Sequence, residues 1–405
     1  MMIYRSYKFY FLLAAVLGFA ASLAAQSQPR VFLMDTKRLS ETRDKIAKHD
    51  ESIKPALSQI EADAKKVLKE GVYSVTTKGV TPPSGDKRDY MSQAPYFWPD
   101  PAKKDGLPYI RKDGERNPEI NKITDHSTLD KMEAGVETTA LAYYLTGNED
   151  YAKKSVELLR AWFLDPATRM NPNQEYGQYI PGVNTGRGIG LIETRGLTRV
   201  VDAIGLLEGS KSLTDKDLQG LKEWYLKFLI WMQESKNGGE ESNSKNNHGT
   251  YYDLQITSYA LFIGKADLAK QTVERAKTKR IALQIEPDGR EPLELVRTKA
   301  WSYSIGNLEG LMELAMLAQR VGVDLWNFET KDGRSIRKAL DFLYPFSMGE
   351  KWKYEQIEGF DPKALYPAMR RAAAHFSDAK FREMMAKVPP VDPASKDSVL
   401  LSRAF

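Results

Sequence analysis

The sequence has 405 residues, of which 42% are hydrophobic and 28% charged, and its formal net charge is +5. This composition permits a large core in one or a few domains, and with no Lys/Arg-rich run it argues against a nucleic-acid partner. The absence of cysteine excludes disulfides, thiolate metal sites and lipidated cysteine anchors.

Residues 1–25 have the pattern of a secretory signal peptide. Arg5 and Lys8 give a basic start, residues 9–23 are mostly apolar, and small residues follow near Ala24. No later stretch is long and apolar enough to span a membrane. We therefore expect a soluble periplasmic or secreted protein, without membrane insertion, in which residues 26–405 form a single domain. Removal of Arg5 and Lys8 with the signal peptide lowers the formal net charge from +5 to +3, and this mild positive charge is compatible with an acidic substrate.

The first part of this domain has two contrasting segments. Residues 37–70 read as one or two charged helices broken at Pro55. Residues 71–121 contain seven prolines and form a loop too long for a plain connector. Aromatic residues are too frequent here for disorder, so we expect an ordered arm that lies over the rest of the protein. The aromatic residues are Tyr90, Tyr96, Phe97, Trp98 and Tyr109.

From about residue 125 the pattern becomes helix, short break, helix, with almost no strand alternation. The breaks carry stop and start signals, such as Gly147 and the pair Thr214 and Asp217, an acidic variant of the capping box. We expect an all-α fold, an α/α barrel (toroid), with a helical solenoid as the alternative; no fixed-period repeat supports the solenoid. Apolar residues at helical spacing cover residues 127–146, 149–164, 189–208, 214–235, 248–263, 265–283, 305–321, 333–345, 361–375 and 378–387.

Two linking segments interrupt the helices, and loops at the ends of a scaffold are where sites are usually placed. Residues 168–190 are rich in amides, glycine and tyrosine and supply Gln178 and Arg187 as candidate substrate-binding residues. Residues 284–304 hold a Pro-Asp-Gly turn and then Arg297 and Tyr303.

Asn246 and Asn247 are good N-cap residues for a buried helix that starts near His248. His248, Tyr252 and Gln255 then share one face at spacings of four and seven residues. An amide, an imidazole and phenols gathered at a helix start suit a binding or catalytic cleft. A capped helix with a structural histidine is the plainer interpretation.

The candidate constellation is Asn247, His248, Arg297 and Tyr303, with Arg195 as a possible fifth member. These residue types suit β-elimination in a uronic acid polymer. An arginine or amide neutralises the carboxylate beside C5, a base takes the C5 proton, and an acid protonates the departing O4. Tyrosine can act if nearby positive charge lowers its pKa, and histidine can act as the base.

Each of these residues also has a purely structural interpretation. Arg297 could pair with Glu294, Tyr303 could be core beside Trp301, and His126 is a second helix-start histidine that we rank below His248. Arg195 lies in an apolar helix and serves either an ion pair or a substrate. Tyr96 and Trp98 either fill the core or stack on sugar faces.

The motif Asn246-Asn247-His248, followed by Arg297-x-x-Ala300-Trp301-x-Tyr303, resembles the alginate lyase superfamily, including the family 5 alginate lyases. The arm segments 94–101, 106–110 and 113–114 and residues 169–173 look more like polysaccharide lyase family 38, which is associated with alginate and glucuronan lyases. The resemblance covers most of residues 90–310. One departure from the family pattern is the position of the arginine, because Arg297 lies six residues before Tyr303.

This resemblance implies an α/α toroid in which Tyr303 transfers the proton, His248 is its partner, and Asn247 and Arg297 neutralise the carboxylate. Substrate-binding candidates are Tyr96, Trp98, His126, Gln178, Arg187, Arg195 and Tyr252. The substrate would be a β-1,4-linked uronan, alginate or glucuronan. With four histidines and no paired-histidine motif, we expect no metal and no cofactor.

Two other function classes compete with a lyase. A glycoside hydrolase needs two carboxylates across the scissile bond, for which Asp125, Glu193, Glu291 and Glu294 are available without forming a recognisable pair. A non-catalytic glycan-binding protein would need only the aromatic arm.

Overall fold

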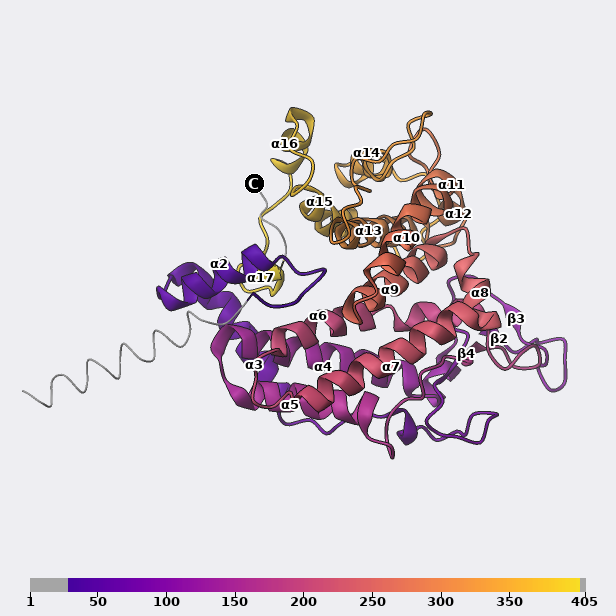
Figure 1. The fold of residues 1–405 in the computed structure, drawn as a ribbon. Coiled ribbons are helices and arrows are strands. Elements are labelled where there is room, and N and C mark those ends of the chain that lie inside the picture. The colour runs from indigo at the N-terminus through magenta and orange to yellow at the C-terminus, as the bar shows by residue number, and fades with distance from the viewer. Residues whose placement is uncertain (1–27, 401–405) are drawn as a thin grey trace, which may run out of the picture.

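The computed structural model describes residues 28–400, so the expected signal peptide lies outside the described residues. Four helices form the inner layer and pack side by side in chain order: α4 (Asp125–Thr146), α6 (Leu197–Leu207), α9 (Asn247–Phe262) and α13 (Ala300–Gln319). Outer helices pack against them, and the layers follow an open arc that does not close into a barrel (Figure 1).

The outer layer consists mainly of α3 (Lys54–Val67), α5 (Glu149–Leu159), α7 (Asp215–Glu234), α10 (Ala266–Ala276), α14 (Ile336–Ser347) and α15 (Tyr366–Ala372). The remaining helices are α2 (Thr36–Ala47), α8 (Lys236–Ser242), α11 (Ala282–Gln284), α12 (Pro292–Leu295), α16 (Ala379–Met385) and α17 (Asp397–Leu400). The 3₁₀ segments are η1 (Glu51–Ile53), η2 (Val75–Thr77), η3 (Pro118–Lys122), η5 (Gly188–Thr194) and η7 (Pro362–Leu365), and η4 (Arg160–Leu164) and η6 (Lys277–Ile281) are π-helical.

The start and stop signals act as the sequence predicts. Gly147 ends α4 in the left-handed conformation with φ of 72°, which costs glycine little. Thr214 and Asp217 form the reciprocal capping box of α7. The inner helix α9 is buried on nearly all sides, because α6, α7, α10 and α13 all pack against it. Pro55 lies in the first turn of α3 and marks its start.

Two predicted boundaries are wrong. The helix expected over residues 189–208 begins as the 3₁₀ segment η5, and regular α-helix starts only at Leu197. Glycines explain this difference, because Gly190 packs against the backbone of Gly177, where an added Cβ would lie 2.7 Å from the carbonyl carbon. Residues 300–304, expected in a linking segment, form the first turn of α13.

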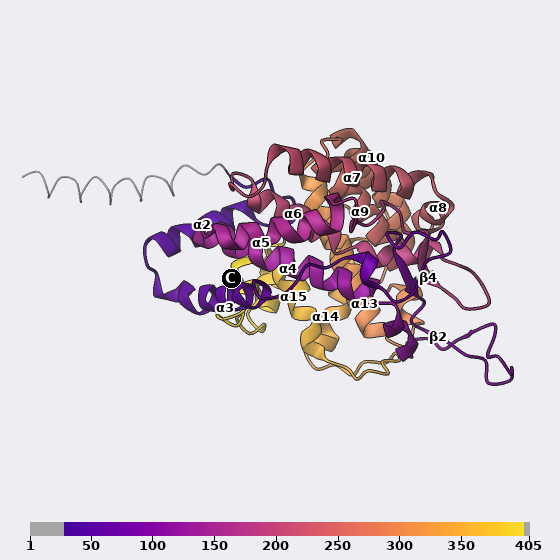
Figure 2. The ribbon, with the colours of Figure 1, turned by 90° about the horizontal axis from the view of Figure 1, so that it is seen from below.

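The arm over residues 71–121 contributes strands β1 (Met91–Gln93), β2 (Phe97–Trp98) and β3 (Ile110–Arg111). Strand β1 pairs in parallel with β4 (Tyr176–Tyr179), which comes from the second linking segment, and β2 pairs antiparallel with β3. Figures 1 and 2 both place β2, β4 and α8 at one end of the molecule, with α2 at the opposite end. The first turns of α4, α9 and α13 lie beside these strands and line one cleft.

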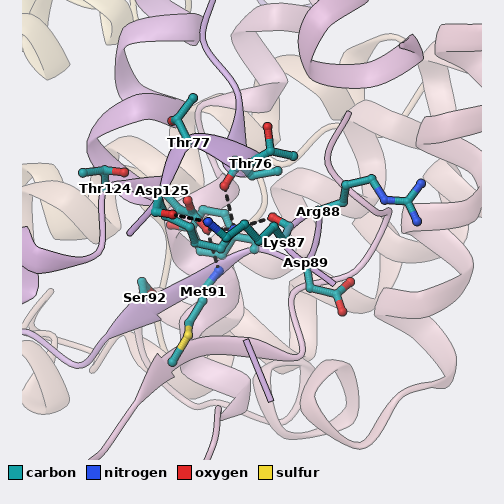
Figure 3. Close-up of polar contacts among 12 residues, drawn as sticks. Thr76, Thr77, Lys87, Arg88, Asp89, Met91, Ser92, Thr124 and Asp125 are labelled. Carbon is teal, nitrogen blue, oxygen red and sulfur yellow. Dashed lines mark hydrogen bonds and ion pairs between the residues drawn. The ribbon is translucent and has the colours of Figure 1, made fainter. Parts of the chain in front are cut away.

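A buried ion pair attaches the arm to α4. Lys78 Nζ lies 2.8 Å from Asp125 Oδ2, and both side chains are almost fully buried. The ammonium also donates to the carbonyls of Val75 and Lys87, while Asp125 accepts the Met91 backbone N–H at 2.9 Å. Figure 3 shows Asp125, Met91 and Lys87 gathered at this point. Burial raises the pKa of Asp125 to about 6, and Lys78 is the main opposing influence.

We predict that Lys78→Met destabilises the protein by about 3–5 kcal/mol, because it leaves a buried carboxylate without its cation. Chemical unfolding measures this loss. In the double variant Lys78→Met, Asp125→Asn the loss should be smaller than the sum of the two single losses. Lys54→Met, which removes the cation of an exposed pair with Glu51, is the control and should cost less than about 1 kcal/mol. Equal losses from the two lysine variants would contradict the prediction.

Candidate active site

The strands of the arm and the first turns of the inner helices enclose a cleft of about 760 Å³. Its lining carries more positive than negative charge, which favours an anionic ligand. The cationic residues are Arg111, Arg116, Arg187, Arg195, Arg297 and Lys299, and the carboxylates are Asp130, Glu193 and Glu358.

Nine of the predicted site residues line this cleft: Tyr96, His126, Gln178, Arg187, Arg195, Asn247, His248, Arg297 and Tyr303. The structure thus brings together side chains from the arm, the segment around β4, and three inner-layer positions that are far apart in sequence.

Tyr303 lies in the first turn of α13 and is held from two sides. Arg297 Nη2 donates to its hydroxyl at 2.9 Å, and the guanidinium carbon lies 3.9 Å from the ring centre. On the other side the Tyr303 hydroxyl donates to the Tyr96 hydroxyl at 3.0 Å. The plainer interpretation, in which Tyr303 belongs to the core beside Trp301, is wrong. Of these two residues Trp301 is fully buried, whereas Tyr303 is partly exposed and lines the cleft.

The environment raises the pKa of Tyr303 above that of free tyrosine. Burial is the main cause, followed by the hydrogen bond with Tyr96, and the positive charge of Arg297 opposes both. The expectation that nearby positive charge lowers this pKa is therefore not met, because desolvation outweighs the guanidinium. A phenol that keeps its proton at neutral pH is suited to donate it to a leaving oxygen.

His248 is held by a buried carboxylate. Its Nδ1 lies 2.9 Å from Glu241 Oε1, and the Glu241 side chain, from α8, is fully buried. A carboxylate on Nδ1 favours the tautomer with the proton there, which leaves Nε2 as an acceptor. The imidazole lines the cleft, so its free nitrogen can receive a proton from a ligand.

Asn247 is held in the same manner, by Glu294 of α12. The backbone N–H donates to Glu294 Oε1 at 2.6 Å, and Nδ2 lies 2.9 and 2.8 Å from the two carboxylate oxygens. Asn247 is thus the first residue of α9, and Asn246 occupies the N-cap without a side-chain capping bond. The predicted side-chain capping by these two asparagines is wrong, because the acceptor comes from Glu294.

Arg297 pairs with Asp113 of the arm instead of Glu294. Nε and Nη2 donate to Asp113 Oδ2 and Oδ1 at 3.0 and 2.9 Å. Although burial opposes ionisation, the hydrogen bonds from Arg297 hold the pKa of Asp113 well below its usual range. Most donors of Arg297 are therefore already engaged by Asp113 and Tyr303.

Three other guanidiniums in the cleft, those of Arg116, Arg187 and Arg195, have no carboxylate partner among the described residues. Arg187 donates from Nη2 to Gln178 Oε1 at 2.8 Å, but its Nε is buried without an acceptor. Burial lowers the pKa of Arg187 to about 10. The amide Nε2 of Gln93 is also a buried donor without an acceptor. Such donors are costly unless a ligand satisfies them.

Gln178 has a left-handed backbone with φ of 50°, which is uncommon for a residue other than glycine. Its backbone N–H donates to Ser92 Oγ at 2.8 Å, and its side chain accepts from Arg187. The strained backbone thus directs this side chain toward Arg187, as strain at ligand sites often does.

Two predicted substrate-binding residues do not line the cleft. Tyr252 is buried, and its hydroxyl donates to the Met232 carbonyl, because this face of α9 turns toward α7. Its neighbour Tyr251 lines the cleft instead. Trp98 is turned away, with Nε1 donating to the Glu115 carbonyl and Lys112 Nζ 5.3 Å from its ring centre. Phe97 occupies the cleft side of β2.

The four carboxylates considered for a hydrolase do not form a pair across the cleft. Only Glu193 lines it, and its Oε2 accepts from Tyr90 and Ser92 at 2.8 and 2.6 Å. Asp125 pairs with Lys78. Glu291 and Glu294 are buried, where Glu291 accepts from Asn307 and Glu294 accepts from Asn247. His126 Nδ1 lies 3.8 Å from Glu193 Oε1 at the edge of the cleft.

Several cleft or supporting residues were missed from the sequence: Gln93, Asp113, Arg116, Glu241, Tyr251 and Glu358. Among these residues, only Asp113 belongs to a segment that the sequence analysis singled out, in the arm. The positions of the others at the cleft depend on the three-dimensional fold and could not be read from the sequence. Among residues 28–400, no cluster of three or more His, Asp or Glu side chains could hold a metal ion. Within the same range, no helix is both long and apolar enough to cross a membrane.

Comparison with known proteins finds alginate lyases in both the family models and the solved structures. The alginate lyase family model matches residues 74–352. The chain is 42% identical to an alginate lyase from Bacteroides ovatus of known crystal structure, with a TM-score of 0.88 over 92% of this chain and 99% of that chain. No curated protein sequence matches the chain.

More distant structures share the fold. Alginate lyase A1-III from Sphingomonas species A1 is 16% identical, with a TM-score of 0.55 over 86% of this chain and 96% of that chain. A variant of alginate lyase A1-III complexed with a tetrasaccharide is 17% identical, with a TM-score of 0.57 over 87% and 94%. The predicted all-α toroid is therefore confirmed, with its ring open. The family match covers most of the chain, and we conclude that this protein belongs to the alginate lyase family and is a polysaccharide lyase.

Proposed function

We propose that this protein cleaves β-1,4-linked uronan, either mannuronate-rich alginate or glucuronan, by β-elimination without a metal. The observation that carries this proposal is one cleft in which a tyrosine held by an arginine and a carboxylate-backed histidine lie among guanidiniums without carboxylate partners. Relatives named alginate lyases support alginate. The likeness of the arm to polysaccharide lyase family 38 is the support for glucuronan.

The reaction removes the C5 proton, forms a C4=C5 double bond, and breaks the C4–O4 bond. O4 leaves with the electron pair of that bond and takes a proton from the Tyr303 hydroxyl. Negative charge moves from C5 into the neighbouring carboxylate as the C5 proton leaves, so cationic groups that contact this carboxylate stabilise the transition state.

The stereochemistry of the sugar decides which residue is the base. In mannuronate and glucuronate the C5 proton and O4 lie on the same side of the ring, so Tyr303 can serve both atoms. It then starts the reaction as a phenolate, accepts the C5 proton and returns that proton to O4. In guluronate they lie on opposite sides, and His248, with Glu241 behind its ring, is placed to act as the base while Tyr303 acts as the acid.

We further propose that the enzyme acts outside the cytoplasm. Support comes from the basic start and the apolar run within residues 1–25, which have the pattern of a secretory signal peptide. N-terminal sequencing of the protein from periplasmic and culture fractions tests this proposal, and an intact Met1 in every fraction would contradict it.

We predict that Tyr303→Phe lowers turnover at least about 100-fold, because only the proton-transferring hydroxyl is lost. The measurement is the ultraviolet absorbance of the 4,5-unsaturated product, which a hydrolase would not form. Thermal stability should change little. His248→Ala should be similarly inactive, and the double variant little worse than either single variant, because the two residues act as a unit.

Tyr109→Phe is the matched control, since its hydroxyl donates to Glu119 and the residue does not line the cleft. It should retain wild-type turnover. If Tyr303→Phe kept more than about half of wild-type turnover on its best uronan, Tyr303 would be removed from the mechanism.

We predict that Arg187→Ala raises KM for uronan about tenfold or more, because a charged hydrogen bond to the substrate carboxylate is lost. Arg187→Lys keeps the positive charge but lacks the Nε donor, so its KM should lie between that of wild type and that of Arg187→Ala. Arg290→Ala, an exposed arginine paired with Asp288 outside the cleft, is the control. An unchanged KM in Arg187→Ala would show that this guanidinium does not bind substrate.

We predict that exhaustive chelation leaves turnover unchanged, because protein groups neutralise the carboxylate and no ion is required. The assay compares enzyme dialysed against chelator with enzyme given excess divalent cation. Loss of activity that a divalent cation restores would contradict metal independence, while the tyrosine prediction would stand.

A further inference from the structure

The turn at Asp113 and Gly114 packs closely against the residues that precede α13. Gly114 has a φ of 76°, and a Cβ added there would lie 2.4 Å from Thr298 Oγ1 and 2.8 Å from Ile357 Cδ1. Glycine adopts this positive φ without strain, and any larger residue would have to displace the side chains of Thr298 and Ile357. The arm, the start of α13 and the segment around Ile357 therefore interlock, although they are far apart in the sequence.

Asp113 accepts hydrogen bonds from three residues at this contact. Arg297 binds it with two nitrogens at 3.0 and 2.9 Å, and Thr298 donates from its backbone N–H and its hydroxyl at 3.3 and 3.1 Å. Arg111 Nη2 also donates to it, at 2.6 Å. Paired bonds between a planar guanidinium and a carboxylate fix the plane of the guanidinium as well as its position.

The same nitrogen of Arg297 that binds Asp113 also reaches Tyr303. Nη2 donates to Asp113 Oδ1 and to the Tyr303 hydroxyl, each at 2.9 Å. If the guanidinium rotated away from Asp113, the bond to the hydroxyl would be lost with it. Asp113 itself does not line the cleft, so it meets neither the substrate nor the reacting atoms.

We propose that Asp113 is a positioning residue for proton transfer, which acts by holding Arg297 against the hydroxyl of Tyr303. The arm is thereby part of the catalytic apparatus, since it also supplies Tyr96 on the other side of the same hydroxyl. This inference rests on the proposed function, in which Tyr303 protonates the leaving oxygen.

The test is Asp113→Asn, which keeps the shape of the side chain but removes the charge that orients Arg297. We expect kcat on the best uronan to fall about 10- to 100-fold, the scale of a small misplacement of a catalytic group, with KM changed less than about threefold because Asp113 does not contact substrate. Asp105→Asn is the matched control: this exposed carboxylate lies in the same arm and accepts only the Leu107 N–H. It should have wild-type kcat.

A double-mutant cycle separates positioning from a general structural role. In an Arg297→Lys background, Asp113→Asn should lower kcat less than about twofold further, because Asp113 acts through the residue already changed. Asp113→Glu keeps the charge but displaces the carboxylate by one methylene, so its kcat should also be lower while its KM is unchanged. If Asp113→Asn does not fold, Asp113→Glu provides the test in its place.

Three outcomes would overturn the proposal: wild-type kcat in the folded Asp113 variants, a loss expressed in KM alone, or independent losses that multiply in the double variant. These outcomes are distinct from failure of the proposed function. If Tyr303→Phe remained active, the assignment of Tyr303 would fall; if Tyr303→Phe is inactive and Asp113→Asn is not impaired, only the role of Asp113 falls.

Discussion

The buried contact between Lys78 and Asp125 is the constraint on which the cleft depends. The arm has little regular structure of its own, and its strands are two or three residues long. Such a segment keeps one conformation only where its polar groups are satisfied by the scaffold. Lys78 and Asp125 provide this at the beginning of α4, and Glu193 provides it again by accepting from Tyr90 and Ser92. One wall of the cleft is thus fixed by buried polar contacts more than by secondary structure.

Carboxylates behind the cleft orient the side chains that line it. Glu241 orients the ring of His248, Glu294 holds the start of α9 through Asn247, and Asp113 holds Arg297. Each is buried or half-buried, so its charge acts through a medium less polarisable than water. These cleft side chains are in this way oriented before any ligand binds, an arrangement that lowers the reorganisation required when charge develops nearby.

The sequence predicted the helical scaffold well because its signals are local. Capping residues and apolar spacing identify α4 and α7, and apolar spacing identifies α9, without knowledge of their neighbours. Glycines that approach other backbones, such as Gly190, are not recognised by a rule based on spacing. For the cleft, sequence patterns identified nine of the residues that line it. They did not identify Glu241 or Asp113, whose importance depends on contacts with segments distant in the chain. Tyr252 and Tyr251 show the same limit, since a helical face cannot be assigned before its packing partners are known.

The common orientation of the inner helices has a consequence for specificity. The first turns of α4, α9 and α13 all lie at the cleft, and the N-terminal end of a helix carries a partial positive charge from its aligned peptide dipoles. Part of the attraction for an anionic sugar is therefore built into the backbone. Substitution of side chains cannot remove it, and it does not titrate. Exchange of side chains in this cleft can therefore change which anion binds best, while the contribution of the helix ends to anion binding stays in place.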